Sequence, residues 1–237
     1  MTPTRGFRSR PQNRFVALVA VILMVMGVGL SACGSEDSDH HADSTDTIHA
    51  ASVSTDVSPA QAALQDGMRT LWFQHMEWTY ATVAAFAAGS KGLQPTLDRL
   101  LANQTQIGDA IKPYYGDEAG TALTTLLKAH INGAVPILVA AKAGNTADLN
   151  KSVAAWYVNA KEIADFLAKA NPQWPKADME DMMKGHIDQT LVYATAQLQG
   201  RYAASITAYG EAEAHMVEMA DMLTAGIVKQ FPDKFTS

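Results

Sequence analysis

The chain has 237 residues, of which 48% are hydrophobic and 18% are charged, a composition typical of one or two globular domains. Residues 1–32 hold four arginines and no acid, so the remainder holds 14 basic and 24 acidic residues, a formal charge of −10 that argues against a nucleic-acid partner. The single cysteine excludes an internal disulfide, a cluster of thiolate ligands and a redox pair of cysteines.

The N-terminal segment has the pattern of an export signal. A basic stretch precedes an apolar run over residues 15–32, although a run of this length is also close to that of an uncleaved membrane anchor. At the end of the run, Leu30-Ser31-Ala32-Cys33 resembles the lipobox of bacterial lipoproteins. The resemblance implies that 1–32 is a cleaved signal peptide, that Cys33 carries a lipid, and that the protein is tethered to a bacterial membrane on its extracytoplasmic side.

The segment 33–57 is predicted to be the acylated cysteine followed by a flexible linker. It is rich in Ser, Asp and Thr and poor in large apolar side chains, so it cannot bury enough surface to fold by itself. His40, His41 and His49 lie among its acids and could hold a metal loosely. A solvated linker with incidental histidines is the simpler interpretation.

From Ser58 onward the apolar residues recur with a helical period, and no alternating strand pattern is present. We therefore expect an all-α bundle over 58–237, built from about six helices that form three antiparallel hairpins. Ser58 and Thr146 are predicted N-caps, and Pro136 is predicted to kink its helix. The expected helices cover about 59–89, 95–112, 117–142, 146–171, 175–200 and 202–230.

A pattern recurs about every 56 residues in this domain. His75, His130 and His186 are 55 and 56 residues apart, one on the first helix of each predicted hairpin. Each second helix carries Asn or His followed six residues later by Asp, again at spacings of 56 residues. Six residues turn a helix by about 240°, so the two members of each pair cannot share a face. The pairs are Asn103 with Asp109, Asn159 with Asp165, and His215 with Asp221.

The repeated histidines are the candidate metal ligands. Burying a charged imidazolium is costly, so each imidazole on an apolar stripe should be neutral and either hydrogen-bonded or bound to a ligand. Three hairpins around one axis would bring His75, His130 and His186 together, with His215 as a fourth ligand, to bind copper, zinc or iron.

Other side chains could complete such a site. Asp109, Asp165 and Asp221 are expected either to bind the metal or to orient the imidazoles. Thioether sulfur beside imidazole would favour copper. The methionines near the repeated histidines in sequence are Met182, Met183 and Met219.

Three other interpretations remain open. Each histidine could instead hydrogen-bond an Asn or Asp of its own hairpin and set the register of two helices. Enzymatic activity is less favoured, because the Glu-x-x-His pairs of di-iron bundles, a nucleophile elbow and glycine-rich nucleotide motifs do not occur. A helical module that docks a protein partner of the cell envelope or a small ligand would use the exposed turns at 113–116 and 171–175.

Two short stretches resemble secreted bacterial proteins. Residues 219–235 are similar to the C-termini of secreted helical proteins without an assigned function. Residues 215–220 resemble a histidine-rich helix of a secreted family linked to copper, without that family's paired histidines. The sequence thus favours a metal-binding lipoprotein of the cell envelope, with a metal-free interaction module as the alternative.

Overall fold

The computed structural model describes residues 57–236, which correspond to the predicted helical domain. The predicted signal peptide 1–32, the lipid attachment at Cys33 and the linker up to residue 56 lie outside the described residues, as does residue 237. Val57–Ser237 forms a compact unit with its own buried core.

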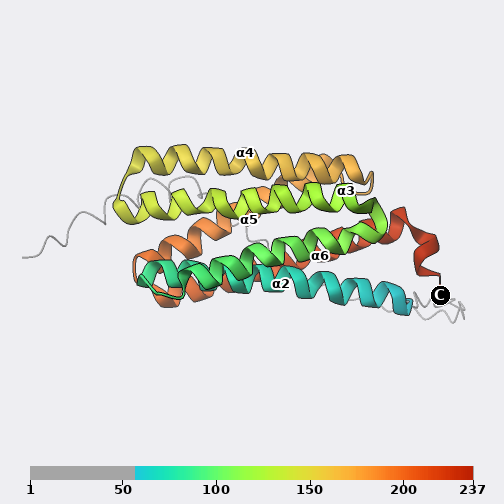
Figure 1. The fold of residues 1–237 in the computed structure, drawn as a ribbon, viewed down its shortest axis with the longest axis horizontal. Coiled ribbons are helices and arrows are strands. Elements are labelled where there is room, and N and C mark those ends of the chain that lie inside the picture. The colour runs from blue at the N-terminus through green and yellow to red at the C-terminus, as the bar shows by residue number, and fades with distance from the viewer. Residues whose placement is uncertain (1–56, 237) are drawn as a thin grey trace, which may run out of the picture. The chain divides into compact units, whose positions relative to one another are not determined.

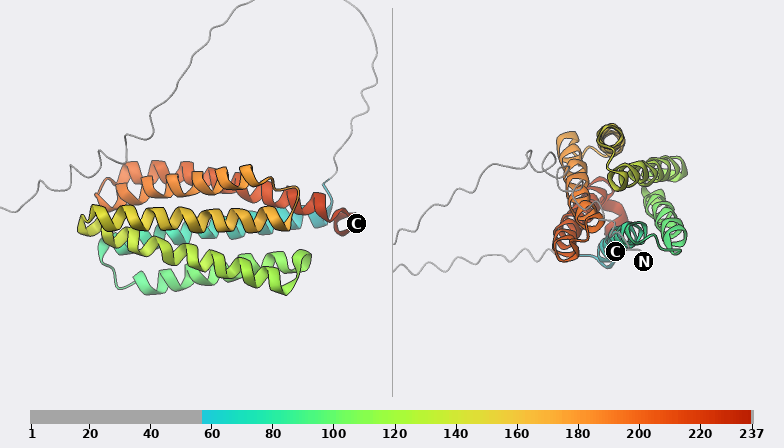
Figure 2. Two further views of the ribbon diagram at one scale, coloured as in Figure 1. Left: turned by 90° about the horizontal axis from the view of Figure 1, so that it is seen from above. Right: turned by 90° about the vertical axis from the view of Figure 1, so that its left-hand side faces the viewer.

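Every regular element within residues 57–236 is a helix, which confirms the predicted all-α class. The chain runs up and down the long axis of the domain, and a short 3-10 helix follows the last α-helix (Figures 1 and 2). The elements are α2 (Pro59–Ala88), α3 (Leu93–Ala143), α4 (Thr146–Ala170), α5 (Lys176–Leu198), α6 (Tyr202–Gln230) and η2 (Pro232–Phe235).

The described residues thus hold five α-helices where the sequence predicted six, and α3 accounts for the difference. Gly116 has φ 83° and ψ 169°, a non-helical conformation that glycine adopts at little cost. The chain folds back there, so the predicted second and third helices are two parts of one element (Figure 1). The two parts approach closely, because a Cβ on Gly108 would lie 2.5 Å from the backbone oxygen of Gly120. The predicted end before Pro113 was wrong, since the helix passes this proline before it turns.

Local sequence signals account for several helix ends. Ser58 accepts a hydrogen bond from the backbone N–H of Gln61, which confirms this predicted N-cap. The cap of α4 is Asn145 rather than the predicted Thr146, because the Asn145 side chain accepts a hydrogen bond from the backbone N–H of Asp148. Only Gly116 has non-helical backbone angles within α3, so Pro136 does not interrupt the helix.

The helices pack mainly against their neighbours in sequence. α2 packs against α3, α3 against α4, and α5 against α6, while α4–α5 and α2–α6 contacts close the bundle (Figure 2). α5 also contacts α2 and α3, so three helices that each carry a repeated histidine meet in the interior. The largest fully buried side chains include Trp174, Tyr193, Met76, Ile107, Ile163 and Ile187.

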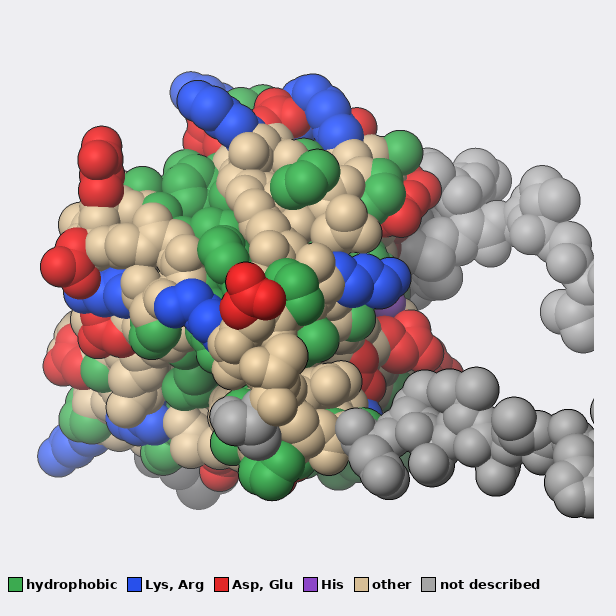
Figure 3. Space-filling view, turned by 90° about the vertical axis from the view of Figure 1, so that its right-hand side faces the viewer, with side chains coloured by type: hydrophobic (Ala, Val, Ile, Leu, Met, Phe, Trp, Pro, Cys, Tyr) green, Lys and Arg blue, Asp and Glu red, His purple; other side chains and the backbone are tan. Residues whose placement is uncertain are grey.

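Two surface properties bear on partners. Acidic and basic side chains are interspersed on the end of the domain that Figure 3 shows, so the acidic excess does not form a single patch on that face. By length and composition, α3 is the one helix among the described residues that could cross a membrane, a test that core helices and signal sequences also pass.

Candidate functional site

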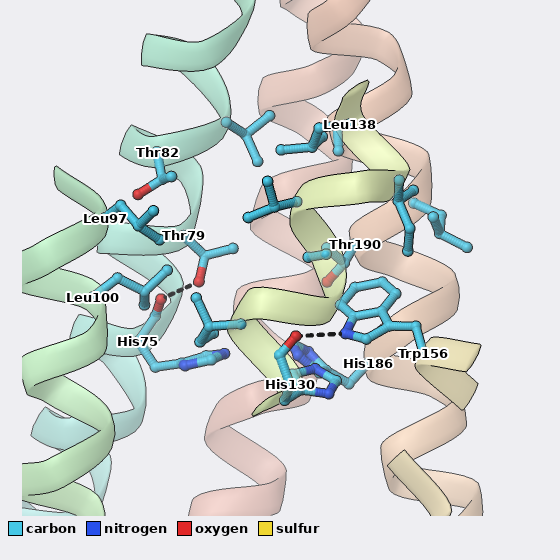
Figure 4. A pocket seen from close by; sticks show the side chains of 17 residues that line it. His75, Thr79, Thr82, Leu97, Leu100, His130, Leu138, Trp156, His186 and Thr190 are labelled. Atoms are coloured by element: carbon cyan, nitrogen blue, oxygen red, sulfur yellow. Dashed lines mark hydrogen bonds between the residues drawn. The ribbon is translucent and has the colours of Figure 1, made fainter. Parts of the chain in front are cut away.

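Three buried imidazoles meet inside the bundle. His75 of α2, His130 of α3 and His186 of α5 are each at most 3% exposed. The ring centres of His75 and His186 are 5.5 Å apart, and those of His130 and His186 are 5.6 Å apart. In Figure 4 the ring of His75 points from α2 toward the other two rings. The fold therefore brings together the three histidines that the sequence predicted to converge, and we call them the histidine cluster.

The histidine cluster lies at one end of an internal cavity of about 50 Å³, which we call the histidine cavity (Figure 4). Its other walls are mostly aliphatic side chains of α2, α3 and α5, with threonines and with Trp156 from α4. Among the described residues, no aspartate or glutamate lines this cavity. The imidazoles are thus the principal polar groups of an otherwise apolar space.

One kind of side-chain hydrogen bond recurs in the three predicted hairpins. In each hairpin, a side chain on the second helix lies against the backbone carbonyl four residues before the histidine. The contacts are Asn103 Nδ2 to Leu71 O at 3.0 Å, Asn159 Nδ2 to Leu126 O at 3.3 Å, and His215 Nε2 to Met182 O at 3.0 Å. These bonds fix the register of each pair of helices, and with it the position of the imidazole.

The partner of His130 determines which of its nitrogens is free. Nδ1 of His130 lies 2.9 Å from Oδ1 of Asn159. The amide nitrogen of Asn159 donates to Leu126 O, so its oxygen is the acceptor and Nδ1 of His130 carries the proton. Nε2 of His130 then has a lone pair, and this buried atom has no hydrogen-bond partner. The bond to Asn159 also confirms the alternative prediction that a histidine pairs with an Asn of its own hairpin.

His75 is held differently. Its Nδ1 lies 3.2 Å from the amide nitrogen of Gln104, which also donates to Leu100 O at 2.9 Å and to Asn103 Oδ1 at 3.1 Å. Turning this amide over would face its oxygen toward two other oxygens, so its nitrogen is the atom that faces the ring. The amide has two hydrogens for three neighbouring acceptors, so Nδ1 of His75 shares them as an acceptor, and the ring carries its proton on Nε2.

Burial keeps all three imidazoles neutral at neutral pH. It lowers the pKa of His75 from 6.5 to about 3, with a further contribution from nearby His130. Burial also lowers the pKa of His130 to about 4, against the opposing effect of its bond to Asn159. The pKa of His186 falls well below 6.5, first through burial and then through the neighbouring histidines. Protons therefore do not compete with a ligand for these nitrogens at neutral pH.

The predicted fourth ligand, His215, does not join the cluster. It is half-buried on α6, and its Nε2 lies 3.0 Å from the carbonyl oxygen of Met182 on α5. A carbonyl oxygen only accepts, so Nε2 is the donor and is committed to this bond. His215 does not line the histidine cavity. Its place corresponds to that of Asn103 and Asn159, which are register side chains.

The three predicted aspartates lie on the outside of the bundle, and none lines the histidine cavity. Their carboxylates face water and pair with basic side chains, so they neither complete a ligand set nor orient the imidazoles. The ion pairs are Asp109 with Lys112 at 2.7 Å, Asp165 with Lys161 at 2.7 Å and Lys176 at 2.6 Å, and Asp221 with Arg69 at 2.6 Å. The helical geometry agrees: Asn103 is fully buried, whereas the Asp109 side chain is 53% exposed.

None of the three predicted methionine donors lines the histidine cavity. Met183 and Met219 line a second cavity of about 20 Å³, which we call the apolar cavity. Within residues 57–236, no three His, Cys, Asp or Glu side chains form a metal-binding group as they stand. Any metal in the histidine cluster must therefore use fewer than three of these side chains or draw the rings closer together.

Two side chains at the cluster were not assigned a role from the sequence. Trp156 stacks on His130 with ring centres 4.8 Å apart, and its Nε1 donates to the carbonyl oxygen of His130 at 2.9 Å. Gln104 is the partner of His75. A glutamine next to the repeated Asn103, at a position with the period of the apolar residues, was the signal that could have revealed the role of Gln104.

No protein-family model, curated protein or solved structure matches this chain. The site itself must therefore support any proposal about function.

Proposed function

We propose that this protein binds a copper, zinc or iron ion within the histidine cluster, and that it does so as a lipid-anchored extracytoplasmic lipoprotein. One observation carries the metal proposal: Nε2 of His130 and Nδ1 of His186 are buried and have no hydrogen-bond partner. Buried polar atoms in native proteins nearly always have a partner. Two such nitrogens on neighbouring imidazoles, whose ring centres lie 5.6 Å apart, are suited to share a metal ion.

The spacing of the rings supports this proposal. Two imidazoles on one tetrahedral metal have ring centres about 5 Å apart, because each nitrogen lies about 2.0–2.1 Å from the metal. The observed separations are 5.5 and 5.6 Å, so a small movement of the rings would suffice. The low pKa values of His75 and His130 further support it, because a metal binds the neutral imidazole.

We further propose that the three hairpins are structural repeats and that the site arose where they meet. The recurring bond from the second helix to the carbonyl before each histidine supports this interpretation. A repeat places equivalent side chains around a common axis, so three histidines on inner helices converge without any local loop to position them.

The proposal is tested by elemental analysis of residues 57–237, which omit the linker histidines. The tag is removed, and the protein is incubated with copper, zinc and iron before desalting. We expect one metal ion per chain, and we expect His186→Leu to abolish binding while the helical circular dichroism spectrum persists. His215→Asn is the matched control, because it introduces the side chain found at the equivalent positions 103 and 159. It should retain the metal.

The alternative function makes the opposite prediction in the same experiment. If the histidines serve only to pack and set register, the domain will hold no metal after any of the three incubations. That result would favour the metal-free interaction module and direct the search to protein partners of the cell envelope.

The lipoprotein proposal rests on Cys33 and has a separate test. The unmodified chain should incorporate a palmitate analogue in cells, whereas Cys33→Ala should not. Absence of the label from the unmodified chain would instead favour 15–32 as an uncleaved anchor.

A further inference from the structure

The histidine cluster also indicates which metal it suits, an inference that rests on the proposed metal-binding function. We propose that the cluster is a two-imidazole site for monovalent copper, with Nε2 of His130 and Nδ1 of His186 as the ligands. The number of free lone pairs, the charge of the cavity and the spacing of the two rings each favour this ion.

The number of free lone pairs is the first argument. Nδ1 of His75 accepts from Gln104 and its other nitrogen carries the proton, so this ring offers no lone pair in its present state. Nε2 of His215 donates to Met182 O. Among the described residues, only His130 and His186 have buried ring nitrogens without a hydrogen-bond partner, and the neutral His186 ring can hold its proton on Nε2, which leaves the lone pair on Nδ1. The absence of a three-residue metal-binding group among residues 57–236 agrees with a site of two ligands.

The charge of the surroundings is the second argument. No acidic side chain among the described residues lines the histidine cavity, and the imidazoles are neutral ligands. The cost of burying an ion rises with the square of its charge, so a divalent ion without a carboxylate or thiolate partner is penalised far more than a monovalent one. Zinc prefers a complete tetrahedral set of ligands, and divalent copper prefers a square-planar or tetragonal set. Monovalent copper is stable at low coordination number.

The spacing is the third argument. With nitrogen–metal bonds of about 2 Å, two imidazoles have ring centres about 6 Å apart on a linear ion and about 5 Å apart on a tetrahedral one. His130 and His186 are 5.6 Å apart, between these limits. Trp156 stacks on His130, and Asn159 holds its Nδ1, so this ring is already oriented with Nε2 free. Little rearrangement is needed for two-ligand binding.

The deciding experiment compares Cu(I) with Zn(II) on residues 57–237. Both ions have filled d shells, so their comparison reports mainly on charge and coordination number. Each is titrated without oxygen against a chromogenic chelator of known affinity. We expect one equivalent of Cu(I) to bind and Zn(II) to bind at least about 100-fold more weakly. X-ray absorption of the copper complex should show two nitrogen ligands.

The ligand assignment is tested with single variants. His130→Leu and His186→Leu should each lose Cu(I), whereas His75→Leu should retain it to within about tenfold. Circular dichroism checks the fold of each, and the corresponding glutamine variants replace any leucine variant that does not fold. Loss of copper in a folded His75→Leu protein would overturn the two-imidazole site but leave the three-histidine function intact.

The charge argument has its own matched pair of variants. Thr190 lines the histidine cavity one turn after His186. Thr190→Asp adds a carboxylate there, and Thr190→Asn adds the same shape without a charge. We expect zinc to bind at least about tenfold more tightly to the aspartate variant than to the asparagine variant. Equal zinc affinities would contradict the charge argument.

The outcomes separate the two proposals. Tight zinc binding by the unmodified domain, equal to or stronger than that of Cu(I), would overturn the monovalent-copper site while supporting the proposed metal-binding function. Failure to bind Cu(I), zinc or iron at all would overturn both.

Discussion

Two small cavities of the bundle differ in the polar groups that line them. The histidine cavity, of about 50 Å³, is bounded by three imidazoles, while the apolar cavity, of about 20 Å³, is bounded by aliphatic, methionine and tryptophan side chains. Both contain nitrogens without a partner, because the indole nitrogens of Trp72 and Trp174 at the apolar cavity are also unpaired. An indole N–H is a donor without a lone pair, so it cannot bind a metal.

A buried nitrogen without a hydrogen-bond partner is therefore not by itself evidence of a functional site. At the apolar cavity the unpaired groups belong to large aromatic side chains whose main role is to fill the core. At the histidine cavity the unpaired groups include ring nitrogens of His130 and His186, on neighbouring imidazoles that come from different helices. The first arrangement follows from packing, and only the second has a chemistry of its own.

The largest expected difference between the two cavities is the effect of acid on stability, because only the histidine cavity contains groups that titrate in this range. The folded-state pKa values of His75 and His130 are about 3 and 4, whereas the ordinary pKa of histidine is 6.5, so the unfolded chain binds more protons than the folded domain between these limits. Their stabilising effect is complete above pH 6.5 and is lost as the pH falls toward 4. At pH 4.5 the metal-free domain should lose about 5 kcal/mol from these two groups together.

Urea unfolding of residues 57–237 at pH 7 and pH 4.5 measures this loss. In a His130→Leu variant the fall between the two pH values should be smaller by roughly a third, because one of the three buried histidines with a lowered pKa no longer titrates. An unfolding midpoint that does not move between pH 7 and pH 4.5 would contradict the assignment of buried neutral histidines.

A truncation at the apolar cavity should destabilise the domain without pH dependence of its own. Ile227 is fully buried and lines this cavity. Ile227→Ala should cost about 3 kcal/mol, because it removes buried methyl groups and enlarges an existing void. The difference from the unmodified domain should be the same at pH 7 and pH 6. Copper affinity measured on the folded variant should not change, and a loss of copper would indicate that the two cavities are coupled.

A milder change tests whether methionine sulfur contributes to the metal site. Met219 lines the apolar cavity and not the histidine cavity. Met219→Leu nearly conserves volume, so it should cost less than about 1.5 kcal/mol and leave the copper affinity unchanged. A substantially weaker copper complex would restore the sequence-based hypothesis of a thioether ligand.

The smallest effect is expected on the outer surface. Asp109 pairs with Lys112 one turn away on an exposed face of α3. Exposed pairs of this kind contribute little, so Asp109→Asn should leave both the urea midpoint and the metal affinity unchanged within error. A loss of metal in this variant would show that the exposed aspartates take part in binding after all.

Much of the fold was predictable because the signals are local. Ser58 and Pro59 begin α2, Gly89 ends it, and α6 covers the range expected from its apolar period. Thr146 was misassigned as the cap because Asn and Thr are both good capping residues. The cap is the last residue before the helix with non-helical backbone angles, and in the structure this residue is Asn145. The break in α3 was expected before Pro113, but the left-handed region that only Gly116 adopts easily set it three residues later.

The candidate site divides in the same way. The inward orientation of His75, His130 and His186 could be predicted from the sequence, since their positions on apolar stripes depend only on the helical period. The six-residue spacing also predicted that the Asn or His and the Asp of each repeated pair face in different directions. The sequence could not predict which residue of each pair faces the interior. Periodicity gives the relative angles of residues within one helix, but it does not give the rotation of that helix against its neighbours.

The tertiary structure was needed to show that Asn103 is buried and that Asn159 contacts His130. It was also needed to show that the aspartates form ion pairs on the surface and that His215 is a register side chain. It also decided which imidazole nitrogens are occupied, since Gln104 and Asn159 reach the rings from other helices or helix segments. These features depend on side-chain contacts between residues that are far apart in the sequence. A one-dimensional pattern places residues on a helix, but the lone pairs left free for a metal are set by what the neighbouring helices present to them.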